Sequence, residues 1–278
     1  MAPSLKDQAV GILQPALLII LGVYHFAATV LTALLTGNIP LLTNISALRE
    51  KAFTRLWTAH ADELSLEMPE PLLPLIKSLH GRVLDIGPGT GSQLKRYNTD
   101  ASIKMMYAAE PAVDLHAELA KSAGKAGLGD RYKILACGAE PESLIPALAR
   151  TGLLERGASE EGIFDDIVSI RVLCGVPRPE ETVAGLYRLL KPGGRLIVCE
   201  HVVNPWQSKE GSVLARLAQV VYKFSGWSFL LGGCNIDRDT EKTLKDAGGR
   251  GGWKEIRLQL VDPHAAIPML TGFLVRSE

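Results

Sequence analysis

The chain has 278 residues, and its 30 lysine and arginine residues balance its 30 aspartate and glutamate residues. This balance excludes the global positive field by which many nucleic-acid-binding proteins act, and the length suits one large α/β domain with an appended segment. Four cysteines lie far apart without a C-x-x-C pair, which argues against a metal site or a disulfide framework and favours buried free thiols.

The N-terminal segment is the most apolar part of the chain. Residues 8–48 contain no Asp, Glu, Lys or Arg, and residues 16–35 would form a helix about as long as a bilayer core is thick, roughly 30 Å. Lys6 is followed by Asp7, so the basic start of a cleavable signal peptide is missing. The sequence therefore predicts a membrane anchor over residues 1–45, either spanning the bilayer or lying in its interface. A buried core helix is the alternative.

The charges after this segment indicate its orientation. Arg49, Lys51 and Arg55 follow the apolar stretch, so the positive-inside tendency places the C-terminal part of the chain in the cytosol. Residues 46–80 then read as two helices interrupted by prolines, which predicts a helical cap or linker.

From residue 81 onward, strand and helix patterns alternate. We expect strands at 82–87, 104–110, 132–140, 164–173, 194–202, 254–262 and 269–276. We expect helices from 92 and from 112, over 141–155 and over 179–191. This alternation predicts an α/β fold, a doubly wound and mostly parallel seven-stranded sheet over 81–278, with one strand antiparallel. Residues 155–162 read as a solvated loop.

A glycine-rich loop follows the first strand. Its pattern is Asp85-x-Gly87-x-Gly89-x-Gly91, whereas the dinucleotide fingerprint would need glycine at Ser92. A nicotinamide oxidoreductase is therefore disfavoured, and the pattern is that of S-adenosylmethionine methyltransferases. The glycines allow positive φ and close approach of the backbone to a ligand.

Two acids follow the next two strands. Glu110 comes 19 residues after Gly91 and can accept hydrogen bonds from both hydroxyls of a ribose. Glu140 is placed to accept one from an adenine amino group. Loop, acids and the KPGG stretch at 191–194 together make a specific signal.

These motifs carry a family resemblance. Residues 81–200 resemble a class I, Rossmann-like S-adenosylmethionine-dependent methyltransferase, and residues 172–202 and 232–248 resemble the membrane-anchored methyltransferase-like-7 group. The resemblance implies methyl transfer to small alkyl thiols by a cytosol-facing domain at the endoplasmic reticulum or lipid droplets. The chain departs from the group at Pro88, where the group has cysteine, and in an extended connection at 141–164.

The predicted cofactor-binding residues come from the glycine loop, the strand ends and the helix before the domain. They are Asp85, Gly87, Pro88, Gly89, Gly91, Glu110, Pro111, Ala139, Glu140, Arg171, Val172, Trp57 and His60. Trp57 and His60 share one face of their helix, which would close over the methionine end of the cofactor. Packing of Trp57 on the sheet is the equal alternative.

Methyl transfer needs an aligned nucleophile, and no metal is expected to take part. A thiol, with a pKa of about 8.5, needs less help from a base than a phenol or an alcohol. His201, at the carboxyl end of a strand, is the candidate base, and a structural role is its alternative. We expect Glu200 in a buried network, Cys174 in packing, and Cys234 without a neighbouring base.

A second apolar stretch covers residues 212–232, within a predicted lid insertion at 202–235. Such a wall suits a small lipophilic acceptor arriving from the membrane, and an ordinary core helix is as consistent with it. O- or N-methylation of a lipophilic natural product, or a reaction without methyl transfer, are the alternative functions.

Overall fold

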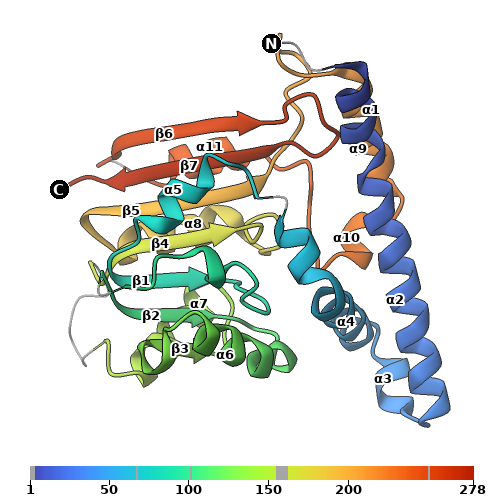
Figure 1. The fold of residues 1–278 in the computed structure, drawn as a ribbon, viewed down its shortest axis with the longest axis horizontal. Helices are drawn as coiled ribbons and strands as arrows, with labels where there is room; N and C mark the ends of the chain where they lie inside the picture. Colours follow the sequence, from blue (N-terminus) through green and yellow to red (C-terminus); the bar gives the residue numbers. More distant parts are fainter. Residues whose placement is uncertain (1–3, 67, 101, 155–161, 250) are drawn as a thin grey trace. The chain divides into compact units, whose positions relative to one another are not determined.

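The computed structural model describes residues 4–66, 68–100, 102–154, 162–249 and 251–278 (Figure 1). The chain divides into two compact units. The larger comprises Asp62–Glu200, Thr240–Gln259 and Leu270–Glu278, and the smaller comprises Met1–Ala61, His201–Asp239 and Leu260–Met269. The predicted insertion at 202–235 thus groups with the N-terminal residues, and all but the last residue of the predicted loop at 155–162 lies outside the described residues.

The larger unit is built on a seven-stranded sheet with the order β3-β2-β1-β4-β5-β7-β6. The strands are β1 (Gly81–Ile86), β2 (Ile103–Ala109), β3 (Tyr132–Leu135), β4 (Phe164–Ile170), β5 (Leu190–His201), β6 (Trp253–Val261) and β7 (Met269–Arg276). The first five pair in parallel, and β7 points against β4 and β6 in Figure 1. The predicted mostly parallel α/β sheet with one reversed strand is confirmed.

Helices connect the strands of this unit. They are α5 (Leu72–Lys77), α6 (His116–Lys125), α7 (Pro141–Arg150), α8 (Pro179–Leu189) and α11 (Thr240–Asp246). The helix expected after the glycine loop is only a short 3-10 turn, η1 (Leu94–Arg96). It ends because Tyr97 adopts extended backbone angles, φ −72° and ψ 145°. Two more such turns, η2 (Val113–Leu115) and η3 (Gly129–Arg131), precede α6 and β3.

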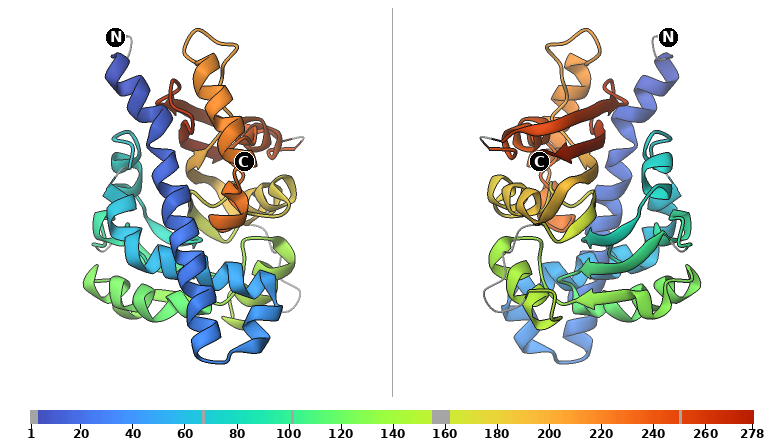
Figure 2. Two further views of the ribbon diagram at one scale, coloured as in Figure 1. Left: turned by 90° about the vertical axis from the view of Figure 1, so that its right-hand side faces the viewer. Right: turned by 90° about the vertical axis from the view of Figure 1, so that its left-hand side faces the viewer.

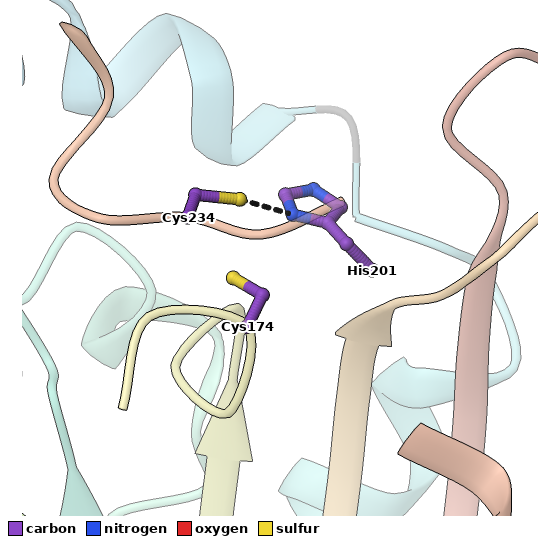
Figure 3. A group of neighbouring side chains, drawn as sticks. All are labelled: Cys174, His201 and Cys234. Atoms are coloured by element: carbon purple, nitrogen blue, oxygen red, sulfur yellow. Dashed lines mark hydrogen bonds between the residues drawn. The ribbon is translucent and has the colours of Figure 1, made fainter. Parts of the chain in front are cut away.

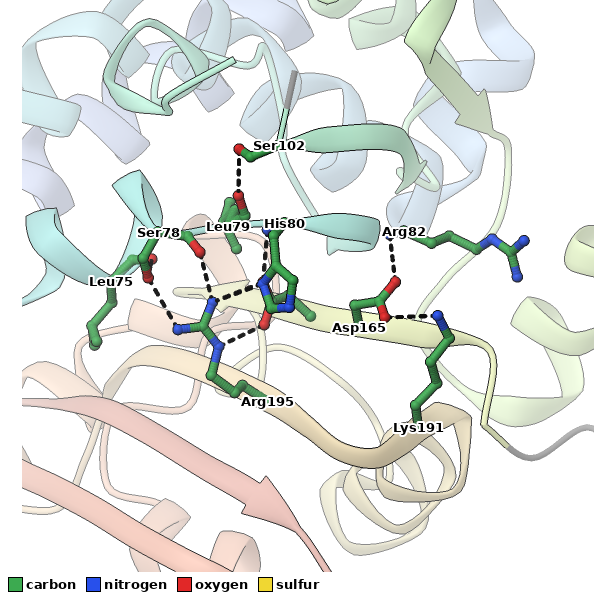
Figure 4. Close-up of polar contacts among 10 residues, drawn as sticks. Leu75, Ser78, Leu79, His80, Arg82, Ser102, Asp165, Lys191 and Arg195 are labelled. Atoms are coloured by element: carbon green, nitrogen blue, oxygen red, sulfur yellow. Dashed lines mark hydrogen bonds and ion pairs between the residues drawn. The ribbon is translucent and has the colours of Figure 1, made fainter. Parts of the chain in front are cut away.

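A buried ion pair ties together the amino ends of the central strands (Figure 4). The fully buried Asp166 of β4 accepts from Arg195 of β5 at 2.7 and 2.8 Å, and from the amide of His80 at 2.9 Å. Arg195 also donates to the carbonyl of Ser78 at 2.8 Å. This network satisfies both charges at the amino ends of the strands. The candidate site lies at the opposite, carboxyl ends.

The smaller unit consists mainly of helices. They are α1 (Leu5–Leu13), α2 (Pro15–Leu35), α3 (Ile39–Thr43), most of α4 (Ile45–Leu66), α9 (Val213–Phe224) and α10 (Trp227–Leu230). In both views of Figure 2, α1 and α2 follow one another as a nearly continuous helix. Residues Leu5–Leu35 are long and apolar enough to cross a membrane, judged by length and composition alone.

The helix α2 buries its small and polar residues and exposes its large apolar ones, which is the reverse of a surface helix in a water-soluble protein. The buried stripe carries small and polar residues, Gly22, His25, Thr29 and Ala33 after the initial Pro15. The exposed face carries large apolar side chains: Leu17, Ile20, Val23, Tyr24, Leu31, Leu34 and Leu35. Small residues let α2 approach α10 closely, since a Cβ on Gly22 would lie 2.9 Å from Leu230 Cβ.

Candidate functional site

The glycine loop leaves the carboxyl end of β1 in the conformation that its sequence predicts. Gly87, Gly89 and Gly91 have φ values of 57°, 61° and 72°. A Cβ on Gly87 would lie 2.7 Å from Val172 Cγ2, and one on Gly91 would lie 2.8 Å from Leu119 Cδ1. At both positions the positive φ favours glycine, and at Gly87 the branched Val172 side chain also leaves no room for a Cβ, in addition to any approach of a ligand.

Glu110 holds the glycine loop against the end of β2. Its buried carboxylate accepts from the amide of Gly89 at 2.8 Å and from the amide of Ala112 at 2.9 Å. A carboxylate oxygen accepts more than one hydrogen bond, so this arrangement is compatible with a hydroxyl ligand. Glu110 is therefore held next to the glycine loop, as the prediction of a shared cofactor site requires.

Asp85 is a deeply buried carboxyl at the end of β1. Burial and then the charge of Glu110 raise the pKa of Asp85 to about 8, against the opposing effect of the Tyr97 and Tyr132 hydroxyls. Among the described residues, Asp85 Oδ2 and the two hydroxyl oxygens make no hydrogen bond of good geometry. A buried acceptor of this kind is expected to find a partner in a bound ligand or in water.

The turn after β4 is fixed by Glu200. This fully buried carboxylate accepts from the amides of Val172 and Leu173 at 3.1 and 3.0 Å and from the Ser169 hydroxyl at 2.5 Å. The prediction that Glu200 lies in a satisfied buried network is confirmed. The turn also holds Arg171 at φ 60°, a strained backbone conformation. Arg171 and Val172, both predicted to bind the cofactor, therefore lie on a well-anchored segment.

The other candidates in the larger unit line the same strand ends. Pro88 is buried within the glycine loop, and Pro111 is exposed directly after Glu110. Ala139 is buried, and Glu140 precedes the first turn of α7 with its side chain turned toward Gly138. Their contacts with a cofactor stay predictions.

Trp57 and His60 lie on α4 in the smaller unit. The Trp57 ring stacks on Phe53, with ring centroids 5.8 Å apart. His60 Nε2 lies 3.2 Å from Nε2 of His25 on α2. The proposed role of the pair in cofactor binding stays a prediction. The partner His25 was not expected, because it lies 35 positions away in the apolar segment.

The end of β5 carries an imidazole–thiol pair that sequence reasoning missed (Figure 3). Nδ1 of His201 lies 3.4 Å from Sγ of Cys234, 33 positions later in the chain. The expectation that Cys234 lacks a neighbouring base was wrong, because the chain returns to the end of β5 after α10. No local sequence signal marks such a return.

The other three cysteines are buried free thiols, as expected. Burial raises the pKa of Cys137 to about 11 and that of Cys199 to about 12, so both stay protonated at neutral pH. Cys174, also drawn in Figure 3, belongs to the larger unit, where its thiol donates to the Arg171 carbonyl oxygen at 3.7 Å.

The residues of the larger unit fit a nucleoside cofactor with a charged amino-acid end. Three glycines with positive φ carry the backbone past the end of β1, and Glu110 places a buried carboxylate beside them. Among the described residues, Asp85 Oδ2 has no hydrogen-bond partner of good geometry. The parallel register of β1 with β2 and β4 brings these groups to one edge of the sheet.

The chain is similar in sequence to known proteins. A family model described as a methyltransferase domain matches residues 54–248. The thiol S-methyltransferase TMT1B of Mus musculus is 25% identical over 217 residues, which cover 76% of this chain and 78% of that protein. The human TMT1B is 34% identical over 87 residues, which cover 31% of this chain and only 33% of the human protein.

Solved structures show the same fold. A possible exported protein from Bordetella parapertussis aligns with a TM-score of 0.57 at 16% identity, covering 92% of this chain and 97% of its own. An O-methyltransferase family protein from Burkholderia thailandensis aligns with a TM-score of 0.53 at 15% identity, covering 86% of this chain and 62% of its own. With the family model spanning most of the chain, the protein belongs to the methyltransferase domain family.

Proposed function

We propose that the protein transfers the methyl group of S-adenosylmethionine to the sulfur of a small lipophilic thiol at a membrane surface. One observation carries the choice of acceptor: relatives named thiol S-methyltransferases align with the chain, in the mouse protein over 76% of its length. The proposal that the protein acts at a membrane surface is supported by the smaller unit, because the exposed face of α2 is made of large apolar side chains.

In this proposal the larger unit binds the cofactor. The backbone of the glycine loop lies against the nucleoside part, and the carboxylate of Glu110 accepts from its ribose. Glu140 accepts from the adenine amino group, and the Asp85 carboxyl forms a hydrogen bond with the amino-acid end. When bound, S-adenosylmethionine supplies a methyl group on a positively charged sulfur. Glu200 keeps the turn with Arg171 and Val172 in one conformation, which limits reorganisation on binding.

His201 acts in this proposal as the base for the acceptor thiol. In the tautomer whose Nδ1–H donates to Cys234 Sγ, Nε2 carries the lone pair of the ring, and that lone pair takes the thiol proton. Cys234 then orients the imidazole as a positioning residue. A thiol needs only modest help because part of it is already thiolate near neutral pH.

The membrane proposal extends to topology and compartment. Arg49, Lys51 and Arg55 follow the apolar segment, which favours a catalytic domain on the cytosolic side. The endoplasmic reticulum or lipid droplets are the compartments that the family resemblance implies.

N-methylation of an amine is the second candidate. A phosphatidylethanolamine N-methyltransferase of Cereibacter sphaeroides is 25% identical over 150 residues, covering 53% of this chain and 63% of that protein. The substrate in that protein's name is a lipid, which would also suit a membrane-bound enzyme.

Turnover of methyl-labelled S-adenosylmethionine by the detergent-solubilised protein separates these candidates. The acceptor panel contains alkyl thiols, phenols of similar size and phosphatidylethanolamine. We expect label in the thiols, with less label after His201→Ala. Transfer to phenols or to phosphatidylethanolamine, with thiols left unlabelled, would replace the proposed acceptor class.

A further inference from the structure

The helix α9 exposes apolar side chains and buries a polar one. Its exposed face is aliphatic and aromatic along its whole length: Val213, Leu214, Leu217, Val221 and Phe224. The spacing of three and four residues places them on one side of the helix. Its buried residues are Ala215 and the polar Gln219. A surface helix of a water-soluble protein has the opposite arrangement.

Gln219 fixes which face of α9 points inward. Its amide nitrogen donates to the carbonyl oxygens of Val202 and Ile236 at 3.0 and 2.8 Å, and its oxygen accepts from the amide of Asn204 at 3.0 Å. The helix cannot rotate its apolar face inward without breaking these buried hydrogen bonds.

The same unit holds α9 beside the N-terminal helix. The Tyr222 hydroxyl donates to the carbonyl of Ile12 on α1 at 2.7 Å. The helix α1 exposes Leu5, Val10 and Leu13, and α2 continues this surface with its own apolar face. Among the described residues, all exposed large hydrophobic side chains except Val113 and Ile256 belong to the smaller unit.

The charged side chains of α9 do not interrupt the apolar face. Lys223 and Arg216 both point to Asp237 of the same unit, at 3.0 and 3.7 Å. Cations that flank an aliphatic face in this way can stay at the level of lipid headgroups while the face enters the acyl region.

We infer that α9 is a second membrane-contacting helix, inserting its Val213–Phe224 face among the acyl chains of the leaflet that receives α1 and α2. The inference rests on the membrane association proposed above. Continuity with the apolar surface of α1 favours a lipid leaflet over a second copy of the chain as the occupant. The acceptor lid predicted around residues 212–232 then contributes its outer face to the membrane.

The depth of a spin label on α9 tests this inference. Full-length Val221→Cys and Val113→Cys variants are labelled with a nitroxide and bound to phosphatidylcholine vesicles, and the labelled parent is measured in parallel to subtract native cysteines. We expect the label at 221 to collide more with oxygen than with a water-soluble nickel complex. The label at 113, exposed on the larger unit, should show the reverse.

Flotation separates the inference from the proposal beneath it. If the protein floats with vesicles but the label at 221 stays in water, the second contact is wrong and the N-terminal anchor stands. If the protein does not float, membrane association itself fails. Protection of the label from both reagents, together with a doubled mass, would identify a second copy of the chain instead.

A charge on the α9 face gives an independent measure. The variant Leu217→Glu/Val221→Glu should lower vesicle partitioning roughly tenfold or more, because two carboxylates would have to leave water. The matched variant Val113→Glu should leave partitioning unchanged. Equal partitioning of all three proteins would overturn the inference.

Discussion

Glu110 is the residue whose contacts give the sharpest prediction for cofactor binding. Glu110→Gln replaces one acceptor by an amide donor that faces either the Gly89 or the Ala112 amide. We expect binding of S-adenosylmethionine to weaken by about 1–3 kcal/mol. Calorimetric titration measures this, and the control is Glu118→Gln, which removes an exposed ion pair with Lys121 on α6. Unchanged affinity in Glu110→Gln would remove Glu110 from the cofactor site.

His201 and Cys234 give a prediction that depends on pH. His201→Ala should slow thiol methylation by up to roughly thirtyfold at pH 7, where only a few per cent of a thiol with a pKa of about 8.5 is thiolate. The loss should be much smaller at pH 9, where most of the acceptor is already thiolate. Cys234→Ala should lower the rate in the same direction, and Cys234→Ser should recover part of it, since oxygen can also accept from Nδ1. Rate–pH profiles for the three variants check this. Equal losses at both pH values would point to a structural role.

Asp85 should make the cofactor-free protein less stable as pH rises. Its folded pKa of about 8 lies above the usual value of about 3.9 for the unfolded chain. The folded state therefore holds a proton that the unfolded state has released, so stability falls between about pH 4 and pH 8. Thermal unfolding of Asp85→Asn should show a flatter dependence over this range. A parallel curve for wild type and variant would contradict the prediction.

At the level of elements, the Arg195–Asp166 pair is the contact that holds β4 and β5 in place at their amino ends. Arg195→Met leaves Asp166 buried without its charged partner, which should cost about 3–5 kcal/mol of unfolding free energy. Urea unfolding in detergent measures the loss. The exposed pair of Lys121 and Glu118 is the control, where Lys121→Met should cost less than about 1 kcal/mol.

The replacement of both partners tests the cause of that loss. Arg195→Met combined with Asp166→Leu removes the unpaired charge and should recover much of the stability. If the double variant is no more stable than the single one, the hydrogen bonds from Arg195 to Ser78 matter more than the ion pair.

At the level of the whole molecule, the sequence predicted the parts that depend on local patterns. The alternation of apolar runs and helices was enough for the sheet, and the glycine spacing was enough for a loop with positive φ. The acid Glu110 could be placed because it directly follows a strand. The 3-10 turn after the loop was missed, since nothing in residues 92–98 announces the extended backbone of Tyr97.

The parts that could not be predicted depend on distant segments meeting. Cys234 reaches His201 only because α9 and α10 return the chain to the end of β5. The outward direction of the α9 apolar face was hidden too, because the sequence shows which residues share a face but not which face is buried. The hydrogen bonds of Gln219 decide that question.

The tight packing of Gly87 and Gly91 affects how genetic variation in this protein should be interpreted. A substitution at either position would meet Val172 or Leu119 and would also strain a left-handed backbone, so the variant protein should be degraded before it can be assayed. In a screen for activity, such alleles would look the same as alleles of Glu110. Measuring cellular abundance beside activity would separate them: low amounts for the glycine variants, normal amounts of inactive enzyme for Glu110→Gln.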